Sequence, residues 1–157
     1  MQKFGDHALI GAGTVLDPAA AEACVRAGAR FIISPGLNLD TVRYCNQAGV
    51  AVFPGALTPT EILTAWRGGA DMVKVFPCSA VGGATYIKAV KAPLHDIDLC
   101  PTGGVSLQTA AAFIQAGASA LGVGGDLVDV EALRSGRGQV IAERARLYLD
   151  IVAEARA

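Results

Sequence analysis

"RFIISPGLNLDTVRYCNQAGVAVFPG", residues 30–55, places two short apolar runs on either side of a helical stretch. The runs, 30–35 and 50–55, are rich in aliphatic residues and end in proline or glycine, as buried strands do before a turn. Ala48-Gly49 stands where a left-handed helix C-cap is expected, just before the second run. This order of strand, helix and strand predicts parallel strands joined by a right-handed crossover.

The same unit recurs on both sides of this segment. Further apolar runs occupy residues 8–13, 72–77, 97–102 and 120–125. Helix starts are predicted at Asp17-Pro18, at the capping box Thr58-Pro59-Thr60-Glu61 and at Ser106. Helix ends are predicted at Gly28, Gly69 and Gly117, and a long last helix at about 138–156. The chain is therefore of the α/β class with a parallel sheet.

The ends of the predicted strands indicate how this sheet is closed. Each strand ends in a polar or glycine-containing turn, which suggests a ring of loops around one pocket and hence a (β/α)8 barrel of the TIM-barrel family. About six of the eight βα units are visible, followed by the C-terminal helix, and the deficit lies at the N-terminus. We expect a single partial barrel domain, residues 1–157. The turns are Thr14, 34–36, 54–55, Pro77, 102–104 and 124–126.

Composition excludes several classes of protein. The net charge is −1 with no basic cluster, so a nucleic-acid partner or an anionic membrane surface is not expected. No apolar run reaches the ~18–20 residues of a membrane helix, and "MQKFGDHALIG" lacks a signal-peptide pattern. The four cysteines are scattered without a C-x-x-C pair, which predicts free thiols, no metal site and a cytoplasmic location.

Lys74 is the most unusual residue in the sequence. It stands in the apolar run "MVKVFP", 72–77, between Val73 and Val75. Spacing alone favours a solvent-facing lysine on an edge strand. A lysine inside a barrel would instead be desolvated, which lowers its pKa and frees the amine for Schiff-base chemistry on a carbonyl. Phe76, on the same face, is either a core residue or a wall of that lysine's pocket.

Two glycine turns follow the last two predicted strands, "PTGGVS" at 101–106 and "GVGGDL" at 122–127. Backbone N–H groups exposed by glycine bind anions, and phosphate sites of such barrels lie after the last two strands. Ordinary tight turns are the alternative. Thr14 and Thr102 end strands and could bind a carboxylate or hydroxyl, although capping or β-propensity also explains them.

The motifs "GAGTVLDP", "ISPG", "VKVFP", "CPTGG" and "GVGG", in this order, resemble the 2-keto-3-deoxy-6-phosphogluconate (KDPG) and 4-hydroxy-2-oxoglutarate (KHG) aldolase family. The resemblance runs from about Gly5 to the C-terminal helix. It implies a class I aldolase, without metal or cofactor, that is a homotrimer and splits a keto-acid phosphate into pyruvate and glyceraldehyde 3-phosphate.

The resemblance also implies residue roles. Lys74 matches the Schiff-base lysine and Thr14 a threonine near the pyruvyl carboxylate. Pro35 and Phe76 match residues that line this pocket, and Thr102 one that contacts the hydroxylated part of the substrate. The phosphate would lie at the glycine pairs Gly103-Gly104 and Gly124-Gly125.

The sequence departs from the family in two respects. Asp126 replaces a serine that contacts the phosphate, and a carboxylate there would repel it unless it points away. A galactonate-type relative also has this aspartate, so the epimer preference is open. The family's general-base glutamate and carboxylate-binding arginine precede "GAGT", and we expect this chain to begin after them. We expect neither Glu22 nor Glu61 to replace the base, because both fall in predicted first turns of helices.

Two other functions fit parts of the sequence. A barrel enzyme similar to thiamine-phosphate synthase would share the two glycine turns without needing Lys74. A non-catalytic, oligomerising or phospho-ligand-binding module would need neither the lysine nor the missing base. Pyruvate trapping at Lys74 distinguishes the aldolase from both.

Overall fold

The computed structural model describes residues 8–157. The chain divides between Phe76 and Pro77 into two compact units, Met1–Phe76 and Pro77–Ala157. That residues 1–157 form one partial barrel domain stays a prediction.

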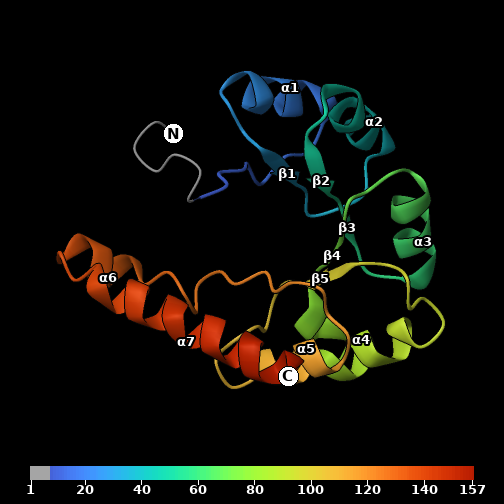
Figure 1. The fold of residues 1–157 in the computed structure, drawn as a ribbon. Coiled ribbons are helices and arrows are strands. Elements are labelled where there is room, and N and C mark those ends of the chain that lie inside the picture. Colours follow the sequence, from blue (N-terminus) through green and yellow to red (C-terminus); the bar gives the residue numbers. More distant parts are fainter. Residues whose placement is uncertain (1–7) are drawn as a thin grey trace. The chain divides into compact units, whose positions relative to one another are not determined.

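The first unit alternates helices with short strands (Figure 1). β1 pairs in parallel with β2, and β3 pairs in parallel with β4, which confirms the parallel pairing predicted from residues 30–55. Both α1 and α2 lie on the same side of the β1–β2 pair (Figure 1). The elements are α1 (Pro18–Arg26), β1 (Phe31–Ile33), α2 (Leu39–Ala48), β2 (Ala51–Phe53), β3 (Gly55–Ala56), α3 (Pro59–Arg67) and β4 (Val73–Val75).

Two helices of this unit, α1 and α3, begin where the sequence predicts. The Asp17 carboxylate accepts a hydrogen bond from the Ala20 N–H at 2.8 Å, and proline is the first residue of α1. Thr58 and Glu61 form the reciprocal capping box of α3. α2 is capped at its C-terminus by Gly49, whose φ of 66° lies in the left-handed region that a side chain disfavours. Gly28, Gly69 and Gly117 also have positive φ, as predicted.

The strand predicted at residues 50–55 is interrupted at Pro54. β2 ends at Phe53 and pairs with β1, whereas β3 begins at Gly55 and pairs with β4. Proline has no N–H to donate to a neighbouring strand, so the ladder breaks there. The Pro54 carbonyl still accepts the Lys74 N–H at 2.9 Å. The chain thus changes strand partner in a single residue.

The first and last predicted strands are reduced to single bridges. In the run 8–13, Ala12 bridges Ile32, and in the run 120–125, Gly122 bridges Thr102. Both runs contain alternating or adjacent glycines, which weaken a strand because they have no side chain to pack. The backbone direction predicted for these segments is retained, but a regular ladder is not.

The core of the first unit lies between its helices and β1 and β2. Its members are all at most 2% exposed, and they include Cys45, a free thiol that packs as a small buried hydrophobe. The cluster consists of Val15, Ala21, Ile32, Val42, Cys45 and Val52.

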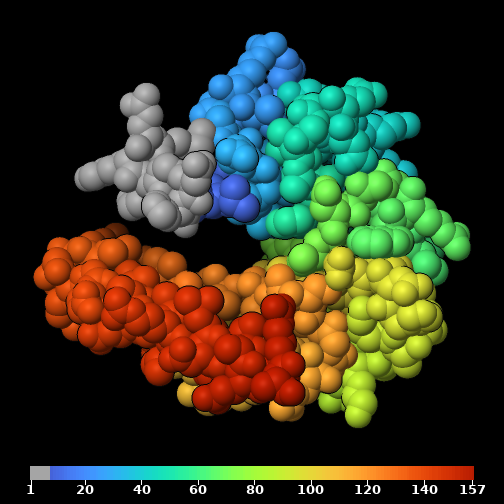
Figure 2. All heavy atoms as spheres, viewed as in Figure 1, coloured from blue at the N-terminus to red at the C-terminus, as the bar shows by residue number. Residues whose placement is uncertain are grey.

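The second unit is built around one strand and a long final helix. α7 (Gln139–Arg156) confirms the C-terminal helix predicted at 138–156 and packs against α5. Figure 2 shows the red side chains of α7 at the surface of this unit, and Tyr148 is its buried residue. The other elements are a 3-10 helix (Cys78–Val81), α4 (Ala84–Lys91), β5 (Leu99–Pro101), α5 (Ala110–Gln115) and α6 (Val130–Arg134).

The helix predicted to start at Ser106 begins only at Ala110. The Thr109 hydroxyl accepts the Ser106 N–H at 2.9 Å and lies 2.9 Å from the Gly104 carbonyl, to which it donates. These contacts stabilise a turn over 106–109 and tie it to the glycine turn, so the helix starts one turn late.

Over residues 8–157, none of the helices combines the length and hydrophobicity that crossing a membrane requires.

Candidate active site

The carboxyl ends of the segments in the first unit lie side by side. The Val15 N–H donates to the Ile33 carbonyl at 3.1 Å, and the Ser34 N–H donates to Phe53 at 3.2 Å. Lys74 is the register partner of Gly55 in the β3–β4 pair. Thr14 and Pro35 therefore follow the ends of neighbouring segments, near the edge at which α/β barrels carry their chemistry, and Lys74 is the middle residue of β4.

Gly55 brings the loop after β1 close to the lysine strand. A Cβ at Gly55 would lie 2.2 Å from both the carbonyl carbon and the carbonyl oxygen of Pro35. The Gly55 N–H also donates to the Gly36 carbonyl at 3.3 Å. Pro35 is thus packed directly on the residue that pairs with Lys74. The sequence showed Gly55 only as part of a proline–glycine turn, and its role in holding Pro35 beside the Lys74 strand was not predicted.

Lys74 is half-buried between two fully buried valines, Val73 and Val75. Its Nζ lies 4.7 Å from the centroid of the Phe76 ring, a distance typical of a cation–π contact. Phe76 is 36% exposed, so it is not a core residue. The ring covers one side of the amine, and this arrangement is compatible with the predicted pocket wall.

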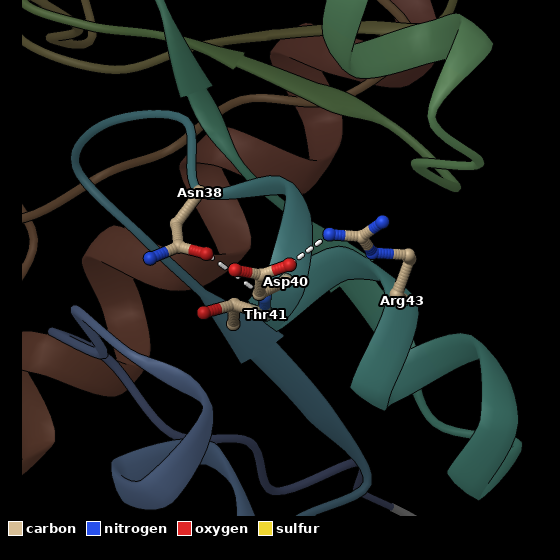
Figure 3. Close-up of polar contacts among 4 residues, drawn as sticks. All are labelled: Asn38, Asp40, Thr41 and Arg43. Carbon is tan, nitrogen blue, oxygen red and sulfur yellow. Dashed lines mark hydrogen bonds and ion pairs between the residues drawn. The ribbon is translucent and has the colours of Figure 1, made fainter.

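The loop that carries Pro35 is fixed by the start of α2 (Figure 3). The Asn38 side chain accepts the Thr41 N–H at 3.0 Å, and Asp40 forms an ion pair with Arg43 one turn along. The Thr41 hydroxyl is buried and has no hydrogen-bond partner among the described residues. The loop therefore leads directly into a capped helix, and the Thr41 hydroxyl in its first turn is left without a hydrogen-bond partner among the described residues.

Of the two glutamates considered in the sequence, only Glu61 serves a helix start as predicted; Glu22 lies beyond the first turn of α1. Glu22 pairs with Arg26 at 2.5 Å on the exposed face of α1. Glu61 accepts the N–H groups of Thr58 at 2.8 Å and Leu57 at 2.9 Å, and these bonds lower the pKa of its carboxyl group. Among residues 8–157, no three histidine, cysteine or acidic side chains are grouped to hold a metal ion.

The first glycine turn of the second unit follows β5. Gly103 and Gly104 have φ of 90° and 76°, so both occupy the left-handed region. The Thr102 carbonyl accepts the Cys78 N–H at 2.9 Å, which holds the turn against the start of the 3-10 helix. Within the described part of the chain, the N–H groups of Gly103, Gly104 and Val105 donate to no protein acceptor. They are therefore available to an anion.

Thr102 and the second glycine turn touch each other. Thr102 bridges Gly122, and a Cβ at Gly122 would lie 2.1 Å from the Thr102 Oγ1. Two residues later, a Cβ at Gly124 or Gly125 would meet no atom within 4 Å. The structure thus brings Thr102 next to Gly122, with open space beside the second glycine pair.

Asp126 points towards α7. Its Oδ2 accepts a hydrogen bond from the Tyr148 hydroxyl at 2.5 Å, and its carbonyl accepts one from Arg144 at 2.7 Å. Burial, and then the Asp126 hydrogen bond, raise the pKa of Tyr148 above its usual range. Sequence reasoning missed both partners, because they lie 18 and 22 residues away and carry no local signal.

A surface pocket of about 340 Å³ lies beside the first glycine turn. It is lined by Ser79, Gly82, Gly83, Thr85, Gly104 and Thr109, among others. Cys78, next to this lining, is buried, and burial raises the pKa of its thiol to about 11. The thiol is therefore not a nucleophile of the site at neutral pH.

Comparison with known proteins extends these observations. The family model "KDPG and KHG aldolase" matches residues 1–143. The chain is 44% identical over 125 residues to 2-dehydro-3-deoxy-6-phosphogalactonate aldolase of Escherichia coli (strain K12), covering 79% of this chain and 60% of that protein. It is 42% identical to the 2-dehydro-3-deoxy-phosphogluconate aldolase of Pseudomonas aeruginosa over 108 residues, 69% of this chain and 49% of that protein.

A solved structure shows the same similarity in three dimensions. KDPG aldolase from Legionella pneumophila, with pyruvate captured as a covalent carbinolamine, has a TM-score of 0.84 and 30% identity. The match covers 96% of this chain and 71% of that one. The chain thus spans 49% to 60% of the length of the two curated relatives named above.

The fold defines an α/β protein of the TIM-barrel family, as the sequence predicts. Within that class, the match over residues 1–143 shows that the chain belongs to the KDPG and KHG aldolase family, a family of aldehyde-lyases.

Proposed function

We propose that this chain acts as a class I aldolase in which Lys74 forms a Schiff base with the substrate. The substrate would be KDPG, cleaved to pyruvate and glyceraldehyde 3-phosphate, or KHG, cleaved to pyruvate and glyoxylate. The observation that carries the proposal is Lys74 itself, a half-buried amine beside the Phe76 ring at the carboxyl edge of the first unit.

The chemistry follows from an amine at this position. The Lys74 Nζ attacks the C2 carbonyl of the keto acid, and loss of water gives an iminium. The C4 hydroxyl then loses its proton, the C3–C4 bond breaks and its electron pair passes into the iminium, which becomes an enamine. Protonation at C3 and hydrolysis release pyruvate and regenerate the amine.

The other predicted residues fall into two groups. In the first unit, Thr14 would bind the pyruvyl carboxylate, and Pro35 and Phe76 would line the pocket. Their support is the shared edge created by Gly55. In the second unit, Thr102 would contact the hydroxylated part of the substrate.

The phosphate would bind at the two glycine pairs, Gly103-Gly104 and Gly124-Gly125. Their support is the contact between Thr102 and Gly122, and the N–H groups that no described acceptor uses. No cofactor is required for this chemistry. The family resemblance adds a homotrimer and a cytoplasmic location, and sedimentation velocity tests the trimer.

Borohydride trapping tests the proposal. Incubation with pyruvate and borohydride should give a stable reduced adduct, which peptide mass spectrometry maps to Lys74. Lys74→Arg should abolish the adduct, because the guanidinium does not form an imine. Lys88→Arg, on an exposed lysine of α4, is the matched control and should leave it unchanged. A folded protein that forms no adduct at Lys74 contradicts the proposal.

We expect proton transfer, not imine formation, to limit turnover in this 157-residue chain. Glu22 pairs with Arg26 and Glu61 belongs to the capping box of α3, so neither is placed to act as a general base, a group that typically contributes ~10²–10⁴-fold. Comparing the single-turnover rate of imine formation with steady-state cleavage measures this difference. Assays with the gluconate and galactonate epimers read the stereochemical preference in the same experiment.

A further inference from the structure

We infer that Asp126, Tyr148 and Arg144 form a positioning device, the α7 anchor, that turns the Asp126 carboxylate away from the Gly124-Gly125 turn and keeps this turn competent to bind a phosphate group. The inference rests on the proposed function and deepens it, because it says what keeps the proposed phosphate site able to bind. Tyr148 and Arg144 act through Asp126 and touch no substrate themselves. It explains how an aspartate is tolerated beside a phosphate site.

The anchor consists of two contacts from one face of α7. Arg144 and Tyr148 are four residues apart, so their side chains lie on the same side of the helix, one turn from each other. Arg144 donates to the backbone carbonyl of Asp126 at 2.7 Å, and Tyr148 donates to its carboxylate at 2.5 Å. The first contact fixes the backbone of the turn and the second fixes the side chain.

Burial makes the tyrosine contact persistent. Tyr148 is 6% exposed, although most of α7 is at the surface. A hydrogen bond to an ionised acceptor is stronger than one between neutral groups, and loss of a buried donor's partner is costly. The tyrosine stays protonated at neutral pH, because burial and the bond to Asp126 raise its pKa. It therefore remains a donor under all physiological conditions.

Among the described residues, several backbone N–H groups of the turn have no protein acceptor. The N–H groups of Leu127 and Val128 both donate to the Gly124 carbonyl, at 2.9 and 3.0 Å. Within residues 8–157, those of Gly124, Gly125 and Asp126 donate to no protein acceptor. A carboxylate that swung back over these groups would compete for them and repel an incoming phosphate. The anchor prevents both effects.

Removal of the Tyr148 hydroxyl tests this idea. Tyr148→Phe keeps the ring but frees the carboxylate, and we expect it to weaken binding of inorganic phosphate by roughly tenfold. Phosphate binding is followed by ³¹P line broadening. Pyruvate trapping at Lys74 should be unchanged, because the first unit is untouched. Tyr44→Phe, at a half-buried tyrosine packed on the first core, is the matched control and should bind phosphate normally.

Rescue separates positioning from simple stability. The double variant Asp126→Asn, Tyr148→Phe should regain phosphate affinity, since the freed side chain is then neutral. A merely structural contact predicts no rescue. If Tyr148→Phe does not fold, Arg144→Gln is the second variant. Arg144 is half-buried, and its replacement removes the hydrogen bond to the Asp126 carbonyl, which should also lower phosphate affinity.

The possible outcomes are distinct. Loss of phosphate binding in Tyr148→Phe with recovery in the double variant supports the anchor. Unchanged binding in the single variant, or no recovery in the double variant, overturns it while the Schiff-base proposal stands. A wild-type chain that traps pyruvate but binds no phosphate also overturns the anchor alone. Failure to trap pyruvate overturns the proposed function independently of these measurements.

Discussion

Gly55 is the residue that joins the Pro35 loop to the lysine strand. We expect Gly55→Ala to destabilise the protein by about 1–3 kcal/mol, because the new methyl group would overlap the Pro35 carbonyl, 2.2 Å away, and force the loop to move. Urea unfolding measures the loss. The displaced loop should also slow pyruvate trapping at Lys74.

The neighbouring glycine supplies the control. A Cβ at Gly36 would meet nothing within 4 Å, so Gly36→Ala should leave both stability and trapping close to those of the wild type. Equal effects of the two substitutions would mean that the close approach at Gly55 is not what positions the loop.

Thr41 offers the opposite prediction at the same scale. Its hydroxyl is buried without a partner in the described residues, and such an atom typically costs about 1–3 kcal/mol. Thr41→Val keeps the branched shape and should raise the free energy of unfolding by about 1 kcal/mol. Thr41→Ser keeps the hydroxyl, loses a buried methyl and should lower it. A destabilised valine variant would show that the hydroxyl is satisfied in solution.

The capping box of α3 has a consequence at the scale of an element. The hydrogen bonds from Thr58 and Leu57 hold the pKa of Glu61 below its unfolded value. The resulting stability is present above that unfolded value and is lost as the pH falls through the folded pKa. Glu61→Gln should therefore flatten the dependence of unfolding free energy on pH below about 5.

Thr58→Ala removes the other half of the same box and should cost about 1 kcal/mol at neutral pH. Denaturant midpoints between pH 3 and pH 7 measure both variants. Identical pH profiles for Glu61→Gln and the wild type would contradict the assignment of this pH dependence to the capping box.

Elements were predictable where the local chemistry decides them. Asp17, Thr58 and Gly49 mark helix ends by their own hydrogen bonds or backbone conformation, so the sequence locates them well. Pro54 shows the limit, because which strands pair on either side of it depends on partners distant in the sequence. The runs 8–13 and 120–125 have the right direction, but their glycines keep them from forming regular strands.

The same reasoning applies to the candidate site. Lys74 and the glycine pairs stand out because their residue types are unusual for their surroundings. Arg144 and Tyr148 are ordinary residues of a helix, and only the packing of α7 brings them to Asp126. Contacts between residues that are far apart in the sequence produce no local motif, so a single sequence does not reveal them.

At the scale of the whole molecule, the reactivity of the four thiols measures how tightly each unit is packed, because each unit contains two of them. Cys24 and Cys100 are half-buried, whereas Cys45 and Cys78 are buried, and burial raises the pKa of both buried thiols, that of Cys78 to about 11. Because the thiolate is the reactive form, we expect a thiol reagent at pH 8 to modify Cys24 and Cys100 much faster than Cys45 and Cys78.

Mass spectrometry of partially modified protein identifies the fast pair, and denaturant should make all four react alike. Raising the pH towards 11 should speed modification of Cys78 as its thiolate forms. Rapid modification of Cys45 or Cys78 at pH 8 would indicate that the corresponding unit opens in solution.

The division of the chain at Phe76–Pro77 also separates the two kinds of proposed contact. Residues assigned to the pyruvyl end belong to the first unit, and those assigned to the phosphate end belong to the second. Exchange of residues 77–157 between relatives would therefore alter the choice of aldehyde without altering the choice of nucleophile. In such a chimaera, acceptor preference would become a transferable property of one segment of the chain.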